Sequence, residues 1–271
     1  MKSGTIVVIT GCSSGIGLET ALYLSERFVT VYPTARYDHE VEALVKRGFD
    51  NAMKLDVRNP EEISTVISAV LEKEGRIDVW FNNAGYGQMG AVEDLPTDAL
   101  REQFETNLFG LHECTRQIVP VMRRQGGGKI IQHSSVLGLV SLPLRGAYNA
   151  SKYAVEGLTD TLRLELEGSG IYPVLLNTGP ITSRFRENAI ATLEKIDMEN
   201  SVWRERYRKS LSSSSSAPFN LTADAVASVV HRIILDDHPR PRYYITKATV
   251  LLGFLKRILS TSMMDKILLK V

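Results

Sequence analysis

Tyr148 and Lys152 stand four residues apart in the stretch Y-N-A-S-K. If Ala147 to Glu167 forms a helix, both side chains lie on one face of it, close enough for the ammonium to act on the phenol. A free tyrosine titrates near pH ~10, and a neighbouring positive charge favours the phenolate and lowers that pKa. The spacing therefore predicts a proton-transfer pair with Tyr148 as general acid or base. The same spacing also occurs on ordinary amphipathic helices, as a packed ring beside a solvated amine.

Two serines precede this pair at the end of a predicted strand. The apolar pattern from Gly128 to His133 is typical of a strand, and it ends at Ser134 and Ser135. Side chains in this position reach the carboxyl end of a parallel sheet, where ligands of such sheets bind. A hydroxyl there can donate to a substrate oxygen. The alternative for either serine is a hydrogen bond to nearby backbone.

A glycine-rich turn near the start of the chain predicts a phosphate site. The β-branched run Thr5 to Thr10 is followed by G-C-S-S-G-I-G and then by a helical pattern. Glycines allow the tight turn and the close approach of backbone amides to a pyrophosphate, which the helix N-terminus also attracts. The candidate nucleotide-binding residues of this turn are Gly11, Ser13, Ser14, Gly15, Ile16 and Gly17.

The end of the second predicted strand, Val29 to Thr34, indicates which nicotinamide cofactor fits. An acid at this position binds the ribose 2′-hydroxyl and repels a 2′-phosphate, whereas an arginine pairs with that phosphate. The sequence supplies Ala35-Arg36, so NADP (NADPH) is favoured and NAD is the less favoured cofactor. The competing interpretation makes Asp38 the ribose ligand and Arg36 a solvated charge.

Further strand ends place more small or polar residues at the same edge. We expect strands at Met53 to Val57, Ile77 to Phe81, Ile171 to Asn177 and Arg242 to Thr246. Helices are expected at Pro60 to Glu74, Asp98 to Arg124 and Thr222 to Asp236, the second of which contains Asn107. The residues after these strand ends that we assign to the cofactor are Asp56, Val57, Asn83, Ala84, Gly85, Pro180, Ile181 and Thr182. Asp56 could accept from an adenine amino group, and Thr182 could hold a carboxamide.

This alternation predicts an α/β fold in one doubly wound domain, with a central parallel sheet of about seven strands and helices on both faces. We place this domain at residues 1–247. It includes a segment at 183–220 that we expect to be irregular, ending in the serine run Ser212 to Ser216, and to act as a lid or a disordered insert. Residues 248–271 form an amphipathic extension. It is too short and too charged to cross a bilayer, but it could lie on a membrane or cover the substrate pocket.

Composition limits the class of partner. A net charge of +1 over 271 residues gives no broad field for nucleic acid, so a small-molecule partner is expected. Two cysteines are too few for a disulfide framework, and the start of the chain lacks a signal-peptide pattern, which together favour a cytoplasmic protein. The five histidines show no metal-ligand spacing, so no metal site is predicted.

Taken in order, these motifs resemble the short-chain dehydrogenase/reductase family, which has a Rossmann-like fold. The resemblance runs over T-G-C-S-S-G-I-G, N-N-A-G at 82–85, Asn107, Ser135 and Y-N-A-S-K. It implies a catalytic tetrad of Asn107, Ser135, Tyr148 and Lys152, with Tyr148 and Lys152 also contacting the cofactor, and hydride transfer between nicotinamide and a carbonyl or alcohol carbon. It also implies that Lys152 holds the ribose, that Asn107 anchors a water, and that the protein is a homodimer or homotetramer. Within the family, the chain looks most like steroid and retinol dehydrogenases and bacterial NADP-dependent aldehyde reductases.

The residues predicted to line the substrate pocket are nearly all apolar: Met89, Leu137, Leu142, Leu144 and Phe185. They favour a hydrophobic aldehyde, ketone or secondary alcohol, although Arg145 and Arg184 could each recognise a carboxylate. The leading hypothesis is an NADPH-dependent carbonyl reductase. The alternatives are a membrane-surface steroid or retinoid dehydrogenase and a non-catalytic NADP-sensing protein.

Overall fold

Strands and helices alternate along most of the chain that this computed structural model describes, residues 4–27, 29–212 and 220–270. The strands are β1 (Thr5–Ile9), β2 (Val29–Ala35), β3 (Met53–Lys54), β4 (Val79–Asn82), β5 (Gly128–Ser135), β6 (Ile171–Thr178), β7 (Ile181–Thr182), β8 (Leu221–Thr222) and β9 (Arg242–Tyr244). The α-helices are α1 (Gly15–Ser25), α2 (Asp38–Val45), α3 (Pro60–Glu74), α4 (Thr97–Phe104), α5 (Leu111–Arg124), α6 (Gly146–Glu165), α7 (Phe185–Ala191), α8 (Arg204–Ser212), α9 (Ala223–Leu235), α10 (Lys247–Ile258) and α11 (Thr261–Leu268).

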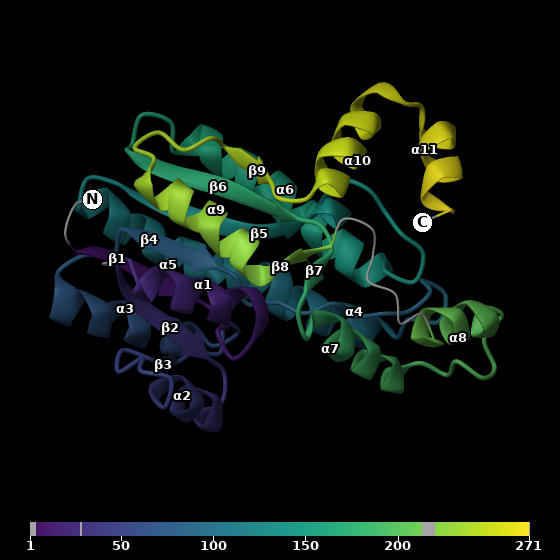
Figure 1. Cartoon of the computed structure of the whole chain (residues 1–271), viewed down its shortest axis with the longest axis horizontal. Helices are drawn as coiled ribbons and strands as arrows, with labels where there is room; N and C mark the ends of the chain where they lie inside the picture. The colour runs from purple at the N-terminus through teal and green to yellow at the C-terminus, as the bar shows by residue number, and fades with distance from the viewer. Residues whose placement is uncertain (1–3, 28, 213–219, 271) are drawn as a thin grey trace.

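Seven of these strands form one parallel sheet in the order β3-β2-β1-β4-β5-β6-β9 (Figure 1). The strands are apolar on both faces because helices cover both. Val7 and Ile9 of β1 pack in the cluster that includes α1 and α9, while Ile6 and Val8 pack in the cluster that includes α3 and α5. This sandwich confirms the predicted α/β fold with a seven-stranded parallel sheet in a single domain.

The sheet changes winding direction between β1 and β4, and the two strand ends are joined at that point. The chain leaves β1 toward β2 on one side and leaves β4 toward β5 on the other, which opens a crevice beyond their carboxyl ends. Thr10 bridges the crevice floor, because its hydroxyl accepts from the backbone N–H groups of Asn83 at 3.0 Å and Ala84 at 2.9 Å. The glycine turn and the N-N-A-G segment therefore lie side by side.

Two predicted elements differ in detail from the structure. The strand expected at Met53 to Val57 is only Met53–Lys54: Leu55 N–H still donates to the Ala35 carbonyl at 2.8 Å, but the chain turns at Val57 and Arg58 before α3. The helix expected at Asp98 to Arg124 is present but contains a π-helical segment, Glu105–Gly110, between α4 and α5. π segments inside helices are often found at functional sites, and this one carries Asn107.

The segment 183–220 was expected to be irregular, and that prediction is wrong over most of its described part. It contains α7 and α8, joined by a short turn of 3-10 helix at Thr192–Lys195. α8 gives no periodic apolar signal, because Tyr207 is its one buried residue among arginines, lysine and serines. Residues 213–216 of the serine run lie outside the described residues.

The chain ends in two helices beyond the main sheet. α10 and α11 lie at the same end of the molecule as α7 and α8, near the carboxyl ends of the strands (Figure 1). Within residues 4–27, 29–212 and 220–270, no helix combines the length and the apolar character that crossing a bilayer requires.

Candidate active site

The glycine turn has the backbone geometry that a close-fitting anion loop needs. Gly11 and Gly15 have φ angles of +71° and +62°, a region in which a side chain is strained. Gly17 allows the close approach of helix and strand, since a Cβ built there would lie 2.4 Å from the carbonyl oxygen of Gly11. Each of the three glycines of the motif is thus required by the backbone it occupies.

The N-terminus of α1 is open toward the crevice. Ser14 occupies the cap position without making a side-chain capping bond, and the first turn contains no acidic residue. The first amide groups of the helix are therefore free of a side-chain cap and offer an anion the positive end of the helix dipole. Ser13 beside them is exposed, whereas Ile16 packs partly against the core. This arrangement fits a phosphate-bearing dinucleotide.

A second chain segment lies against the glycine turn. A Cβ built on Gly15 would be 3.4 Å from the Cβ of Ser183, which places the Pro180–Thr182 stretch next to it. Ile181 and Thr182 form β7, and the Thr182 hydroxyl accepts from the Asn220 side-chain amide at 2.7 Å. The segment predicted to hold the pyrophosphate and the segment predicted to hold a carboxamide are thus neighbours.

Two arginines follow the ends of β2 and β3, Arg36 and Arg58, and they differ in their carboxylate partners. Arg58 is held by Asp56, whose pKa the Arg58 guanidinium lowers through a hydrogen bond of 2.5 Å. Arg36 is exposed, stacks 4.4 Å from the centre of the Tyr37 ring and makes no ion pair with a described carboxylate. Val57 is buried against Gly110, where a Cβ would lie 2.7 Å from its Cγ2. Arg36 is therefore the available cation at this end of the crevice.

Tyr148, Lys152 and Ser135 converge at the ends of β5 and α6. The Lys152 ammonium lies 5.6 Å from the centre of the Tyr148 ring and donates to the backbone carbonyl of His133 at 2.6 Å. The Ser135 hydroxyl accepts from the Leu137 N–H at 3.1 Å, which leaves its own proton free to donate. Ser134 instead points away from the crevice, because its hydroxyl donates to Glu156. Of the two serines, Ser135 is the one beside the phenol.

The electrostatics of this pair differ from the simple expectation. Burial raises the pKa of Tyr148 to about 12, while Ser135 and Arg145 act to lower it. Burial also lowers the pKa of Lys152 to about 8, which the Glu156 carboxylate partly opposes. The expected lowering of the Tyr148 pKa by Lys152 is absent because the ammonium is directed at a backbone carbonyl.

Asn107 is buried and holds the loop that follows β4. Its side-chain oxygen accepts from Tyr86 N–H at 3.0 Å, and its amide donates to Tyr86 carbonyl at 2.9 Å. The same amide reaches the Ser151 hydroxyl at 3.3 Å, one residue before Lys152. Asn107 therefore links the N-N-A-G loop to the helix of Tyr148. The water that the family resemblance assigns to it stays a prediction.

Sequence reasoning missed Glu156, which lies one helical turn beyond Lys152. Its buried carboxylate accepts from Ser134 and from the Asn177 amide at 2.6 Å, and it pairs with Arg242 of β9 at 2.7 Å. Burial raises the pKa of this carboxyl, and its three partners oppose that rise. Glu156 thus links β5, β6, β9 and α6 one helical turn from Lys152.

We expect Glu156→Gln to lower the free energy of unfolding by roughly 1–3 kcal/mol, because Arg242 then keeps only the more exposed Asp160 as counter-charge. Urea unfolding measures this loss. Asp160→Asn is the matched control: Asp160 also contacts Arg242, at 3.2 Å, but its side chain is 43% exposed. The control should cost less than about 1 kcal/mol. Equal losses in the two variants would contradict the assignment.

The apolar residues predicted to surround the substrate fall into two groups. Met89 and Leu144 are buried in the cluster beneath α7 and α8, which we call the lid helices because their segment is predicted to be a lid or a disordered insert. Leu137 and Leu142 pack with α10 and α11. Phe185 is half-exposed with its ring centre 5.3 Å from that of Tyr148. Leu144 has a left-handed φ of +61°, which its buried side chain and the bond from Gly90 N–H to its carbonyl at 3.0 Å hold in place.

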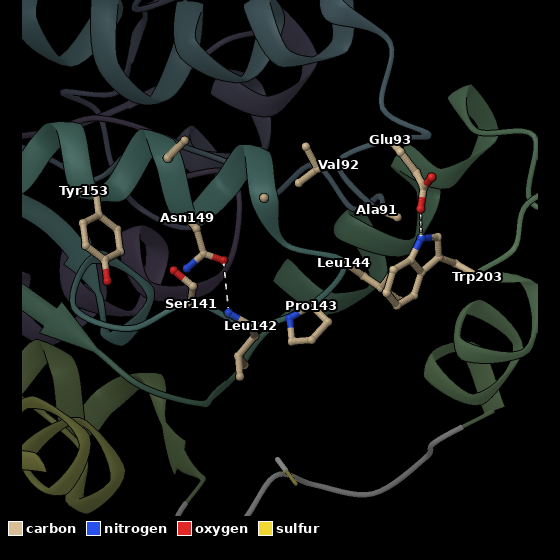
Figure 2. Close-up of a pocket in the computed structure, with 12 residues that line it drawn as sticks. Ala91, Val92, Glu93, Ser141, Leu142, Pro143, Leu144, Asn149, Tyr153 and Trp203 are labelled. Carbon is tan, nitrogen blue, oxygen red and sulfur yellow. Dashed lines mark hydrogen bonds between the residues drawn. The ribbon is translucent and has the colours of Figure 1, made fainter. Parts of the chain in front are cut away.

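A largely apolar cavity of about 830 Å³ adjoins this region (Figure 2). Leu142 and Leu144 line it, together with Val92, Tyr153 and Trp203. No member of the predicted tetrad lines it, because it opens on the face of α6 that carries Asn149 and Tyr153. The cavity therefore lies beside the predicted proton-transfer pair, but neither Tyr148 nor Lys152 lines it.

α8 and the residue before it are hydrogen-bonded to the loop after β4. The Tyr207 hydroxyl donates to Asp94 at 2.8 Å and accepts from Ala91 N–H at 2.7 Å. The Trp203 indole donates to Glu93, as Figure 2 shows. The two arginines considered for carboxylate recognition differ, since Arg184 is exposed and lies 3.7 Å from Glu187, whereas Arg145 lies near Tyr148.

Other candidate chemistries find no support among the described residues. Cys12 and Cys114 are free and fully buried, and burial raises the pKa of the Cys12 thiol to about 12 and that of Cys114 further. No group of three or more histidine, cysteine or acidic side chains in the described ranges is arranged to bind a metal ion.

Comparisons with known proteins agree with this geometry. The family model described as short chain dehydrogenase matches residues 5–194. The oxidoreductase YbbO of Escherichia coli K12 is 38% identical over 263 residues, which cover 97% of this chain and 93% of YbbO. Human 17-beta-hydroxysteroid dehydrogenase type 1 is 34% identical over 203 residues, which cover 71% of this chain and 61% of that protein. The crystal structure of a short-chain dehydrogenase from Streptomyces avermitilis superposes with a TM-score of 0.76 at 27% identity, covering 98% and 94% of the two chains.

Proposed function

Because this chain belongs to the short-chain dehydrogenase family and is an oxidoreductase of that type, we propose that it transfers hydride between NADP(H) and a hydrophobic carbonyl compound or the corresponding alcohol. The observation that carries the proposal is the convergence of Tyr148, Ser135 and Lys152 at the mouth of the crevice formed by β1 and β4. The family model and the relatives confirm the resemblance found in the sequence at the level of the family.

The residues around the crevice fit a nicotinamide dinucleotide. The uncapped N-terminus of α1 and the left-handed glycines fit its pyrophosphate, and Arg36 fits a 2′-phosphate. Asn83, Ala84 and Gly85 leave room beside β4 for a flat nucleoside. Pro180, Ile181 and Thr182 would hold the nicotinamide half. When bound, the cofactor supplies the hydride for reduction or accepts it in oxidation.

The chain's own side chains supply the proton transfer. In reduction, Ser135 donates a hydrogen bond to the carbonyl oxygen and Tyr148 delivers its phenolic proton to the same atom. A proton donor must stay protonated, and the pKa of about 12 keeps Tyr148 protonated at neutral pH. Lys152, as an ammonium, would hold the ribose, and Ser135 and Arg145, which act to lower the Tyr148 pKa, would stabilise the phenolate that remains. Asn107 would position the helix of Tyr148 through Ser151.

A hydrophobic substrate follows from what surrounds Tyr148. Phe185 packs on its ring, the cluster containing Met89 and Leu144 lies on the lid side, and the cluster containing Leu137 and Leu142 lies on the side of α10. The human steroid dehydrogenase among the relatives has, by its name, a substrate of this character. The guanidinium of Arg145, near the phenol, would pair with a carboxylate on a substrate that also carries one.

The experiment that tests this proposal is a panel of aliphatic and aromatic aldehydes, ketones, steroids and carboxylated aldehydes, assayed with NADPH and NADH separately. We expect oxidation of NADPH with apolar carbonyl compounds. Tight NADPH binding without turnover on any compound would instead favour a protein that senses NADP without catalysis. A self-associating form in sedimentation would support the homodimer or homotetramer that we also propose.

We expect Arg36→Leu to raise KM for NADPH by about 10–100-fold and to leave KM for NADH nearly unchanged, because a charge-assisted bond to the 2′-phosphate is lost. Steady-state kinetics with both cofactors measure the change. Asp38→Asn is the companion variant, because Asp38 is the competing ribose ligand. A large loss of NADH use in Asp38→Asn, with no effect of Arg36→Leu on NADPH, would reverse the cofactor assignment.

A further inference from the structure

The outward face of α10 is apolar and has no partner among the described residues. Val250, Leu251, Phe254 and Ile258 are 51%, 53%, 59% and 60% exposed. Spacings of three and four residues place Leu251, Phe254 and Ile258 on one face of the helix. Isolated exposed leucines are ordinary, but four large apolar side chains side by side mark an interaction surface. We call these four residues the α10 stripe.

The opposite face of α10 is firmly packed, so the exposure of the stripe is not a sign of a loose helix. Leu252 and Leu255 belong to the cluster with Val136, Val140 and Met264. Thr246 caps the helix by accepting from Thr249 N–H at 3.2 Å. A shallow apolar hollow of about 390 Å³ adjoins the exposed side, lined by Ile245, Thr246, Lys247, Val250, Leu251 and Phe254. α10 thus presents a fixed apolar ridge with a hollow beside it.

The two C-terminal helices carry an excess of positive charge. Residues 247–270 contain one acid, Asp265, and five exposed basic residues, which are Lys247, Lys256, Arg257, Lys266 and Lys270. None of the five forms an ion pair with a carboxylate in residues 4–27, 29–212 or 220–270. The segment therefore carries a net charge of +4, whereas the whole chain carries +1. Basic charge flanking an apolar helix face complements an anionic lipid surface.

We propose that α10 and α11 dock the protein on the surface of an anionic lipid bilayer, with the α10 stripe entering the boundary between headgroups and acyl chains and the basic residues contacting the headgroups. Each basic residue near such a surface contributes on the order of 1 kcal/mol. The docking needs no spanning segment, in agreement with the absence of a helix fit to cross a bilayer in the described ranges.

A second copy of the chain fits this face less well. A helix of 12 residues is about 18 Å long, so its exposed side offers a few hundred Å², below the ~800 Å² that each partner of a stable interface buries. A two-fold interface would also bring the like charges of the two copies together. These five uncompensated charges favour a polyanionic surface over a self-complementary one.

The placement of α10 gives docking a consequence for substrate entry. Its inner face covers residues 136–142, the loop that directly follows Ser135. A membrane held against α10 would thus lie next to the loop that carries Leu137 and Leu142, two of the residues proposed to surround the substrate. The docking itself does not depend on the proposed function, because it is measured without substrate.

The experiment is flotation of the full-length protein with vesicles of phosphatidylcholine alone and with vesicles that also contain phosphatidylglycerol. We expect the protein to float with the anionic vesicles and to be released by high salt, which screens the basic residues. The variant Leu251→Ser/Phe254→Ser/Ile258→Ser should lower the bound fraction at least tenfold. The variant Lys256→Gln/Arg257→Gln/Lys266→Gln should lower the fraction bound to anionic vesicles and leave the fraction bound to phosphatidylcholine vesicles unchanged.

The matched control is Leu235→Ser/Val202→Ser, which removes two exposed apolar side chains from α9 and from the lid. It should float like the unmodified protein. Thermal unfolding and carbonyl reduction in solution check that each variant is folded.

Absence of flotation with anionic vesicles overturns the proposal, as does an equal loss in the control. If the unmodified protein does not float and the stripe variant changes from dimer to monomer in sedimentation, the α10 stripe is instead an interface with a second copy of the chain. A protein that floats but reduces no carbonyl would refute the proposed function alone.

Discussion

Tyr148→Phe should lower kcat/KM for carbonyl reduction by about 10³-fold or more while NADPH binding stays within a few-fold of its original strength. A positioned acid or base accounts for roughly 10²–10⁴-fold of an enzyme's rate, and in the proposed reaction Ser135 only donates a hydrogen bond to the carbonyl oxygen. Phenylalanine keeps the ring that packs against Phe185. Steady-state rates and fluorescence titration with NADPH separate the two effects.

Tyr153→Phe is the matched control for this variant. Tyr153 lies on the same helix, five residues further on, and its hydroxyl donates to the Leu139 carbonyl at 2.6 Å. Losing that bond should cost about 1 kcal/mol of stability and leave turnover within a few-fold. If Tyr148→Phe keeps its turnover, Tyr148 is not the proton donor of the reaction.

The parts of the fold that the sequence predicts well are those with a strong local pattern. β1 is a continuous β-branched run that is buried on both faces, and α3 begins with Asn59-Pro60 and ends at Gly75. The Asn59 side chain accepts from Glu61 N–H at 3.0 Å, and Gly75 has a φ of +73°. Such signals are contained in a few neighbouring residues, so they can be interpreted without the rest of the chain.

The features that the sequence does not predict depend on contacts between distant residues. α8 is stabilised by one buried tyrosine, whose hydroxyl bonds to Asp94 more than a hundred residues earlier in the chain. Glu156 looks like an ordinary polar helix residue until β9 brings Arg242 to it. No local pattern distinguishes such residues from solvated ones.

The tetrad shows the same division. Four-residue spacing is enough to place Tyr148 and Lys152 on one helix face, but the direction of the lysine side chain depends on β5. The His133 carbonyl receives the ammonium, and burial then acts on both groups, raising the pKa of the phenol and lowering that of the amine. The sequence therefore predicts the pair but not the protonation equilibrium that the fold imposes on it.

Lys152→Met should make the folded protein more stable at pH 7 while lowering turnover by at least about 10²-fold. Lys152 is only 5% exposed, and burial lowers the pKa of its ammonium from 10.5 to about 8. That change corresponds to roughly 3 kcal/mol at ~1.4 kcal/mol per pKa unit. Losing the bond to the His133 carbonyl costs about 1 kcal/mol of that gain. We therefore expect the free energy of unfolding to rise by about 2 kcal/mol in total. Urea unfolding of the cofactor-free protein measures it.

The pH dependence of this gain identifies its cause. Because the folded-state pKa of Lys152 lies below that of the unfolded chain, the folded protein bears the full cost of the buried ammonium below about pH 8. That cost declines as the pH rises from about 8 to 10.5 and is absent above 10.5. The advantage of Lys152→Met over the unmodified protein should therefore shrink across this range. Lys46→Met, at an exposed position after α2, should change stability by less than about 0.5 kcal/mol at either pH. A gain in Lys152→Met that stays constant from pH 7 to 10 would mean that packing, and not the buried charge, is responsible. A loss of stability at pH 7 would show that the ammonium at this site stabilises the fold and that its role is not restricted to the reaction.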